Sequence, residues 1–307
     1  MSDFTPQELM AIFAMQGFSG LSLFSVLLLM ALGLAIIYGQ MRVINMAHGE
    51  FMVIGAYATY VISTLVTNYA PWLVNYYIFF AVPIAFGAAF IVGWIVETLL
   101  IRHLYNRPLD SLLATWGLAL IMQQTFRSLF GAREVSVRLP EWLQGSYQPT
   151  LMIDIPINGM AIMVLTLLVT AGVAWLLYRS RWGLRVRCTT SNREMSGAVG
   201  INTRSVDRAT FAIGCGIAGI AGAAFTAISS TGPTSGSLYI VDTFLVVVFG
   251  GAASLLGTVA AAFSIAQGQS ILEFFISGSM AKVATLLIVI CILMLRPEGL
   301  FASKVRR

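Results

Sequence analysis

Charged residues are scarce in this sequence. Lys and Arg number 18 and Asp and Glu number 13 among 307 residues, which together make 10% of the chain, whereas soluble domains average ~25%. Hydrophobic residues make up 58%, and the mean hydropathy is +0.85. This composition excludes an ordinary soluble domain and predicts an integral membrane protein.

The sequence contains several long apolar runs. Each extends for ~20 residues, which lets a helix cross the ~30 Å hydrocarbon layer of a bilayer. The runs lack the alternation of apolar and polar residues that a membrane β-barrel needs. We therefore predict an all-α, polytopic membrane protein. Six runs are clear spans: 21–40, 45–67, 76–101, 111–130, 157–178 and 209–228.

Cysteine and histidine are also rare, with three and two residues respectively. The cysteines show no redox or metal spacing, and no cluster of His, Cys or carboxylate side chains suits a metal. Neither lysine follows a glycine, so the phosphate-binding loop G-x-x-x-x-G-K-[ST] is absent. We predict no catalytic residue, no metal, no cofactor and no ATP hydrolysis by this chain, which is therefore not an enzyme.

Basic residues are unevenly divided between the connections of these spans. If successive connections alternate between the two sides, fourteen Lys and Arg fall on one side and three on the other, with Lys282 unassigned. Basic connections stay in the cytoplasm. We therefore predict that the N-terminus lies outside and the C-terminus in the cytoplasm.

The apolar region 242–295 must then hold an odd number of crossings. Three full crossings would need nearly all of its residues, so we expect two short or re-entrant segments, broken near Gly250-Gly251 and Gly257, and a last helix from about Lys282 to Leu295. The whole chain would contain 8 to 10 helical segments. Irregular backbone at membrane depth is tolerated where it lines a cavity, so this region is a candidate pathway lining. Alternatively, glycines simply allow close helix packing, which we favour for those in the preceding span: Gly214, Gly216, Gly219 and Gly222.

A polar stretch at 179–208, which we call the elbow, interrupts the apolar sequence with seven arginines. Its Ser191 to Glu194 has the S-x-x-E spacing of a capped helix start, and Gly200 is placed to end that helix. Met195, Ala198 and Val199 would form an apolar face, opposite Arg193 and Ser196. Such a face predicts a partner; the alternative is that the elbow packs on its own membrane domain.

Ionisable residues inside the predicted spans are costly in lipid and mark pairing or a pathway. Glu50 and Glu97 both fall near the cytoplasmic ends of their spans, at the level of Arg42, Arg102 and His48. Asn45 shares a helix face with His48. We favour a structural or gate-forming charge network on the cytoplasmic side over a substrate site.

Uncharged polar groups are the better candidates for contact with a neutral polar solute. Gln123 and Gln124 lie in the middle to outer half of the fourth span, with Thr115 and Trp116 one to two turns below. An amide both donates and accepts hydrogen bonds, and an indole offers a flat apolar wall. Buried glutamines also serve as hydrogen-bonding groups between helices, and this interpretation is equally open.

Several separated segments carry a resemblance to a known family. They are Ile44 to Glu50 with Gly55-Ala56-Tyr57, Leu113 to Leu118 with Gln123-Gln124 and Phe130-Gly131-Ala132, Arg187 to Ile201, Phe249-Gly250-Gly251, and Leu295 to Phe301. Together they resemble the membrane subunits of the branched-chain amino acid ABC importer family. The form Asn-Met-Ala-His-Gly-Glu at 45–50 is most similar to the urea branch of that family.

This resemblance implies one transmembrane permease domain, 1–307, in the inner (plasma) membrane. Its implied partners are a second permease subunit, two ATP-binding subunits, an external substrate-binding protein and membrane lipid, with no nucleic acid. The elbow would couple the chain to an ATPase subunit through Arg193, Glu194, Met195, Ala198 and Val199.

The resemblance implies import of urea. The alternative is the same machine carrying branched-chain amino acids or short amides. A zwitterion would need buried partners for two charges, and the outer half of the predicted pathway offers few ionisable residues apart from Arg127 and Asp242. A hypothesis of another class is a stand-alone urea channel or secondary transporter, which would need no ATPase and leaves the elbow without a purpose.

Overall fold

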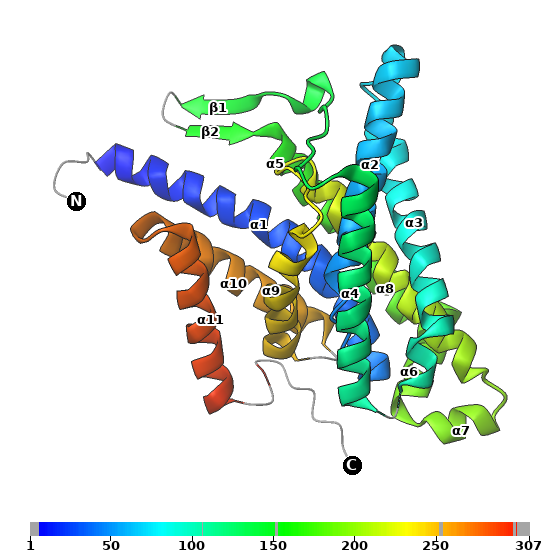
Figure 1. The fold of residues 1–307 in the computed structure, drawn as a ribbon. Coiled ribbons are helices and arrows are strands. Elements are labelled where there is room, and N and C mark those ends of the chain that lie inside the picture. Colours follow the sequence, from blue (N-terminus) through cyan, green and yellow to red (C-terminus); the bar gives the residue numbers. More distant parts are fainter. Residues whose placement is uncertain (1–5, 106, 151–152, 252–253, 297–298, 300–307) are drawn as a thin grey trace.

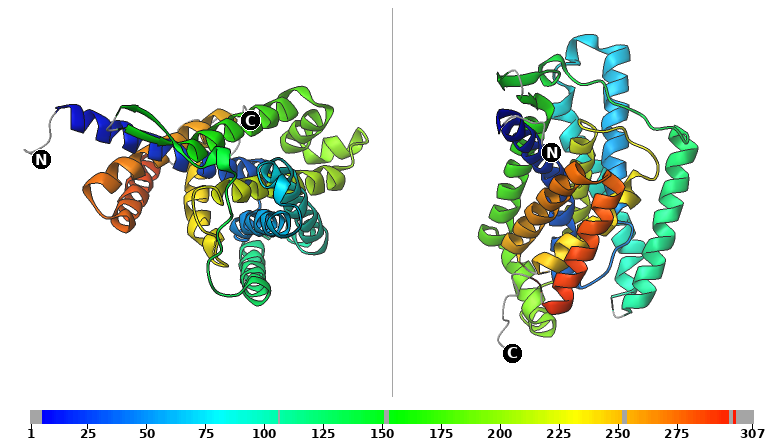
Figure 2. Two further views of the ribbon diagram at one scale, coloured as in Figure 1. Left: turned by 90° about the horizontal axis from the view of Figure 1, so that it is seen from above. Right: turned by 90° about the vertical axis from the view of Figure 1, so that its left-hand side faces the viewer.

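A computed structural model describes residues 6–105, 107–150, 153–251, 254–296 and 299. Its α-helices are α1 (Pro6–Met41), α2 (His48–Tyr69), α3 (Tyr77–Leu99), α4 (Pro108–Phe130), α5 (Ile157–Arg179), α6 (Arg181–Ser191), α7 (Arg193–Ala198), α8 (Thr203–Phe225), α9 (Ser235–Gly250), α10 (Leu255–Phe275) and α11 (Gly278–Leu295). Figures 1 and 2 show most of them as one bundle, with the short α6 and α7 at one end. Among the described residues, seven helices are long and apolar enough to cross a membrane, and the predicted all-α polytopic class is confirmed.

Each of the six predicted spans coincides with a helix. Helix α4 has 23 residues, but it falls outside the set of seven because polar side chains such as Gln123 and Gln124 dilute its apolar sequence. The first helix begins at Pro6, well before the predicted start at residue 21. Its 36 residues make a rod of ~54 Å that runs diagonally across the bundle in Figure 1.

The additional turns of α1 are covered by α10. The Ser270 hydroxyl donates to the Gln16 carbonyl (2.7 Å), and the Gln16 amide donates back to the Ser270 carbonyl. The Gln267 amide donates to the Gly17 carbonyl at 3.2 Å. A long-range partner of this kind cannot be read from the sequence of α1 alone.

The C-terminal apolar region agrees with only part of the prediction. Helix α9 is short, with 16 residues, and stops at Gly250, where Gly251 has φ +86°; the break predicted at Gly250-Gly251 is confirmed. The break predicted near Gly257 is wrong, since Gly257 lies in the first turn of α10, where its amide donates to the capping Ser254 hydroxyl at 3.0 Å. Helix α10 is a full-length helix of 21 residues. The last helix ends at Leu295 as predicted but begins at Gly278.

The centre of the bundle is α8, which packs against α1, α2 and α3. Its glycines allow this contact: a Cβ on Gly214 would lie 2.6 Å from the Gly33 carbonyl oxygen, and one on Gly222 would overlap the Met52 carbonyl. Gly216 lies similarly against the Phe86 ring and Gly219 against the Ala85 carbonyl. The prediction that these glycines serve close helix packing is confirmed.

A small antiparallel hairpin precedes α5 and was not expected. Strands β1 (Ser146–Thr150) and β2 (Ile153–Pro156) pair with Ser146 opposite Pro156 and Tyr147 opposite Ile155. Figure 1 places the hairpin above the N-terminal part of α1, at the end of the bundle opposite α7. It helps to enclose a cavity at this end.

Candidate functional site

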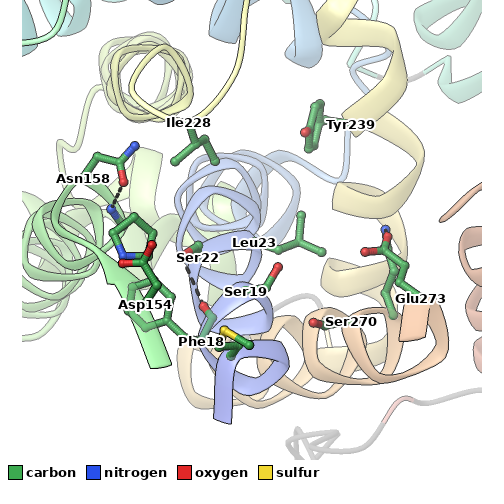
Figure 3. A pocket seen from close by; sticks show the side chains of 14 residues that line it. Phe18, Ser19, Ser22, Leu23, Asp154, Asn158, Ile228, Tyr239, Ser270 and Glu273 are labelled. Carbon is green, nitrogen blue, oxygen red and sulfur yellow. Dashed lines mark hydrogen bonds between the residues drawn. The ribbon is translucent and has the colours of Figure 1, made fainter. Parts of the chain in front are cut away.

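A cavity of ≈ 510 Å³ lies among α1, β2, α5, α9 and α10, at the end of the bundle that the distribution of basic residues assigns to the outside. Its lining contains two carboxylates and no Lys or Arg among the described residues. Figure 3 shows Asp154 and Asn158 on one side of α1, and Ser270 and Glu273 on the other. Hydroxyls of α1 complete the polar surface: Ser19 and Ser22.

Several polar groups around this cavity already have partners. The Asn158 side chain donates to the Ala227 carbonyl (2.7 Å) and accepts from the Gly159 amide (2.8 Å), which holds the start of α5 against the end of α8. The Gln269 amide donates to Glu273 at 3.0 Å. Lys282 contacts the ring of the lining residue Tyr239, and its charge is paired with Asp242 at 2.7 Å.

The outer cavity therefore presents hydrogen-bond acceptors rather than a binding site for anions. Carboxylates accept hydrogen bonds from N–H groups, so a solute rich in such donors fits the lining. The sequence alone does not reveal this site. Asp154 is conspicuous only as a lone acid before the fifth span, and Glu273 lies within a long apolar region; only the fold brings them to one cavity.

The four residues predicted for a solute pathway do not converge. Thr115 is fully buried and accepts from the Met46 amide at 3.1 Å, while its own hydroxyl reaches carbonyl oxygens nearby. Trp116 is 54% exposed, and Gln124 is exposed on the outer face of α4. Only Gln123 points into the bundle together with Thr115, because successive residues of a helix point ~100° apart.

Gln123 joins the two predicted sets of residues, since its amide donates to Glu50 at 2.7 Å. The Glu50 side chain is 1% exposed, and its second carboxylate oxygen has no partner among the described residues. Gln123 lies ~22 Å along α4 from Pro108. Glu50 therefore lies deeper in the bundle than its predicted place near the cytoplasmic end of the second span.

The remaining members of the predicted charge network have separate partners. His48 is buried, with Nε2 3.1 Å from the Met30 carbonyl oxygen. Asn45 is buried and accepts from the Ala47 amide at 3.1 Å. A single network joining Asn45, His48, Glu50 and Glu97 is not formed, because each side chain meets a different helix or its own backbone.

Glu97 belongs to a second polar group near the elbow. It accepts from the Tyr105 hydroxyl (2.6 Å) and pairs with Arg208 of α8 (3.3 Å). The Arg208 guanidinium also lies over the Trp94 ring. Burial, followed by the hydrogen bond to Glu97, raises the pKa of Tyr105 above its ordinary value, so its hydroxyl remains a donor at neutral pH.

The elbow consists of two helices, α6 and α7, with a break at Asn192. The Asn192 side chain caps α7 by accepting from the Met195 amide at 3.0 Å. The predicted cap at Ser191 is wrong, because Ser191 is the last residue of α6 and the extended backbone falls one residue later. Gly200 has φ +88° just beyond α7, which confirms the predicted helix end.

Helix α7 exposes its apolar face and buries part of its polar face, the reverse of an ordinary amphipathic surface helix. Met195 is 63% and Val199 74% exposed, and Ala198 is exposed as well. Ser196, on the opposite side of α7, is buried. The second polar residue, Arg193, pairs with the buried Asp207 of α8. None of the residues that the structure describes packs over this apolar face, and Glu194 is exposed beside it.

The Arg193 to Asp207 contact extends into the membrane helices. Gln40, near the end of α1, donates to the other Asp207 oxygen at 3.0 Å, and the Arg193 guanidinium lies over the Tyr105 ring. Through Tyr105 and Glu97 the elbow also contacts α3. Helix α7 is thus linked by side-chain contacts to α1, α3 and α8.

The fold agrees with a comparison against known families. Residues 17–295 match the family described as branched-chain amino acid transport system / permease component. The chain belongs to this family. It is thus a multi-pass membrane permease component, which confirms that it is a transport subunit rather than an enzyme.

Named relatives of this family span nearly the whole chain. LivH of Salmonella typhimurium, a high-affinity branched-chain amino acid transport system permease protein, is 26% identical and covers 94% of this chain and 95% of its own length. BraD of Pseudomonas aeruginosa is 27% identical and covers 92% of this chain and 93% of its own length. A probable LivH of Methanocaldococcus jannaschii is 23% identical and covers 90% of this chain and 88% of its own length. No solved structure matches the chain.

Proposed function

We propose that this chain is the permease subunit of an ATP-driven importer in the plasma membrane. Residues 1–307 would form one permease domain, joined by a second permease subunit, two ATP-binding subunits and an external substrate-binding protein. The observation that carries the proposal is the outward apolar face of α7, formed by Met195, Ala198 and Val199. An exposed apolar face on a cytoplasmic helix is typical of a docking site for another protein.

The ATP-binding subunit is the partner that this face would bind. The opposite side of α7 is tied to α8 through Arg193 and Asp207. A docked subunit that moves on ATP binding would thus pull on the membrane helices. Glu194, exposed beside the face, would contribute to the rim of the contact.

For the solute we propose urea, with branched-chain amino acids as the second candidate. The names of the relatives, which are branched-chain amino acid permeases, support the second candidate more directly. Two observations favour urea: the Asn45 to Glu50 segment, and an outer cavity whose described lining includes Asp154 and Glu273 but no Lys or Arg. An amino acid's carboxylate would lack a cation there, whereas urea carries four N–H donors and no charge.

Docking is tested with the Met195→Asp/Val199→Asp variant in a co-purification with the ATP-binding subunits. We expect binding to be lost because two charges would be buried in the contact. Thr190→Asp/Ser191→Asp adds the same charge to exposed positions elsewhere on the elbow and should bind normally. Undiminished binding by the first variant would refute the docking face. Urea conduction by the isolated chain in liposomes without ATP would instead favour the channel hypothesis.

The solute is tested by uptake of labelled urea and labelled leucine into proteoliposomes. These contain the complete complex and each candidate binding protein. We expect ATP-dependent uptake of urea. Uptake of leucine without urea would establish the second candidate while leaving the importer proposal intact.

A further inference from the structure

A second cavity, of ≈ 640 Å³, lies at the cytoplasmic end of the bundle, where α3, α7 and α8 approach one another. Figure 1 shows α7 at the same end of the bundle as the C-terminal end of α3. Five arginines and a histidine line this cavity with a single carboxylate: Glu97, Arg102, His103, Tyr105, Arg107, Arg193, Thr203, Arg204 and Arg208. We refer to it as the arginine cavity.

Carboxylates offset only part of this charge. Arg208 pairs with Glu97 and Arg193 with Asp207. Arg107 pairs with Asp110 at 3.6 Å. Arg102 has only the neighbouring His103 ring, at 3.4 Å, and Arg204 has no partner within the described chain.

The excess positive charge predicts an anionic ligand. Guanidinium groups bind phosphate oxygens with two parallel hydrogen bonds. Thr203 adds the first turn of α8 to the lining, where the partial positive charge of a long helix also favours an anion. A phosphate group is therefore the chemistry that this cavity fits.

An apolar stripe leads to the same place along α3. Ile91, Ile95 and Leu99 are exposed and lie four residues apart, so they share one face of the helix. The stripe ends one turn before Arg102, and Trp94, under the Arg208 guanidinium, is partly exposed beside it. An anion with long apolar chains would satisfy the cavity and the stripe together.

We propose that the arginine cavity binds the phosphate headgroup of an anionic phospholipid from the cytoplasmic leaflet. Arg102 and Arg204 would hold the phosphate, and an acyl chain would lie along Ile91, Ile95 and Leu99. Basic pockets between membrane helices on the cytoplasmic side suit such headgroups. The proposal depends on the membrane topology and not on the solute or on ATPase docking.

The bound lipid would act on the elbow because Arg193 lines the same cavity. A phosphate placed beside Arg193 competes with Asp207 for the guanidinium. The position of α7, and hence of its outward face, would then depend on the lipid composition of the membrane.

Native mass spectrometry of the purified full chain tests the proposal, with phosphatidylglycerol and phosphatidylcholine added separately. We expect preferential binding of phosphatidylglycerol. Arg102→Gln/Arg204→Gln should weaken it about thirtyfold, or ~2 kcal/mol. The control Arg181→Gln/Arg185→Gln removes two exposed arginines of α6 outside the cavity and should bind as the wild type does.

Equal binding of the two lipids, or equal loss in both variants, would overturn the proposal. Competition with inorganic phosphate separates the two sources of the ligand. Full displacement of phosphatidylglycerol by inorganic phosphate would identify a free-phosphate site and refute the lipid assignment. Retention of the lipid at the same phosphate concentration would support it, because only the lipid also occupies the stripe.

Discussion

The guanidinium of Arg193, on the short helix α7, is paired with the carboxylate of Asp207 in the first turns of α8. The Asp207 side chain is completely buried, whereas that of Arg193 is 45% exposed. This ion pair attaches the elbow to α8, the central helix of the bundle.

Arg193→Gln should therefore loosen α7 without unfolding the bundle. The buried carboxylate keeps its hydrogen bond to Gln40, and the partly exposed guanidinium is screened, so we expect ~1 kcal/mol rather than the 3–5 kcal/mol of a fully buried pair. Hydrogen exchange of the amides at 193–199 should accelerate. Arg181→Gln, on the exposed side of α6, should leave these amides unchanged, and equal exchange in both variants would contradict the attachment.

Gln123→Ala should destabilise the protein much more than Gln124→Ala. Gln123 is the hydrogen-bond donor to the buried Glu50, and removing it leaves a carboxylate without a partner, at a cost of ~2–3 kcal/mol. Gln124 is exposed, and its loss should cost less than ~0.5 kcal/mol. Thermal unfolding in detergent measures both. Adding Glu50→Gln to Gln123→Ala should restore stability, because a neutral amide costs less to bury; an unrescued double variant would speak against this explanation.

Asp154→Asn/Glu273→Asn should weaken solute uptake by the assembled importer. Both carboxylates line the outer cavity, and losing charged acceptors should raise the half-saturating solute concentration about tenfold. The maximal rate should change little, since the coupling face is distant. Glu134→Gln/Glu141→Gln neutralises two acids that do not line this cavity and should behave as the wild type. Unchanged uptake by the first variant would remove the cavity from the solute path.

Gly222→Ala should destabilise the bundle by ~1–3 kcal/mol. The new methyl group would overlap backbone atoms of α2 at Met52 and Ala56, so the two helices would have to separate. Gly268→Ala makes the same change in α10, where a Cβ meets no atom within 4 Å. We expect that control to be neutral or slightly stabilising, measured as the midpoint of thermal unfolding, and similar losses in both would refute the packing argument.

Tyr105 predicts a loss of stability at alkaline pH. Its pKa is raised in the folded protein by burial and by the hydrogen bond to Glu97, so the folded state retains a proton that the unfolded state releases near pH ~10. The stabilisation is complete below pH ~10 and falls as the pH rises further, by up to ~1.4 kcal/mol per pH unit. Tyr105→Phe should show a shallower decline in stability above pH ~10. Parallel pH profiles for the two proteins would contradict the assignment.

The sequence correctly predicted those features that depend only on residues close together in the chain. Apolar runs located six helices, because crossing a bilayer requires an uninterrupted apolar segment. Gly200 predicted the end of α7 because only glycine adopts its φ without strain. Predicted helix boundaries were wrong where contacts with another segment matter. The first turns of α1, from Pro6 onward, are contacted by α10. The choice between Ser191 and Asn192 as the cap of α7 depends on where α6 ends.

The sequence by itself determined the membrane-spanning class, the orientation and the position of a basic cytoplasmic elbow, since these follow from the cost of burying charge in lipid. Tertiary structure alone decided which polar residues meet. It paired Glu50 with Gln123 and Arg193 with Asp207, and it brought Asp154 and Glu273 to one cavity. These partners lie on different elements of the fold. Which of them meet depends on how the helices pack, and the sequence pattern of each helix does not specify its partner residues.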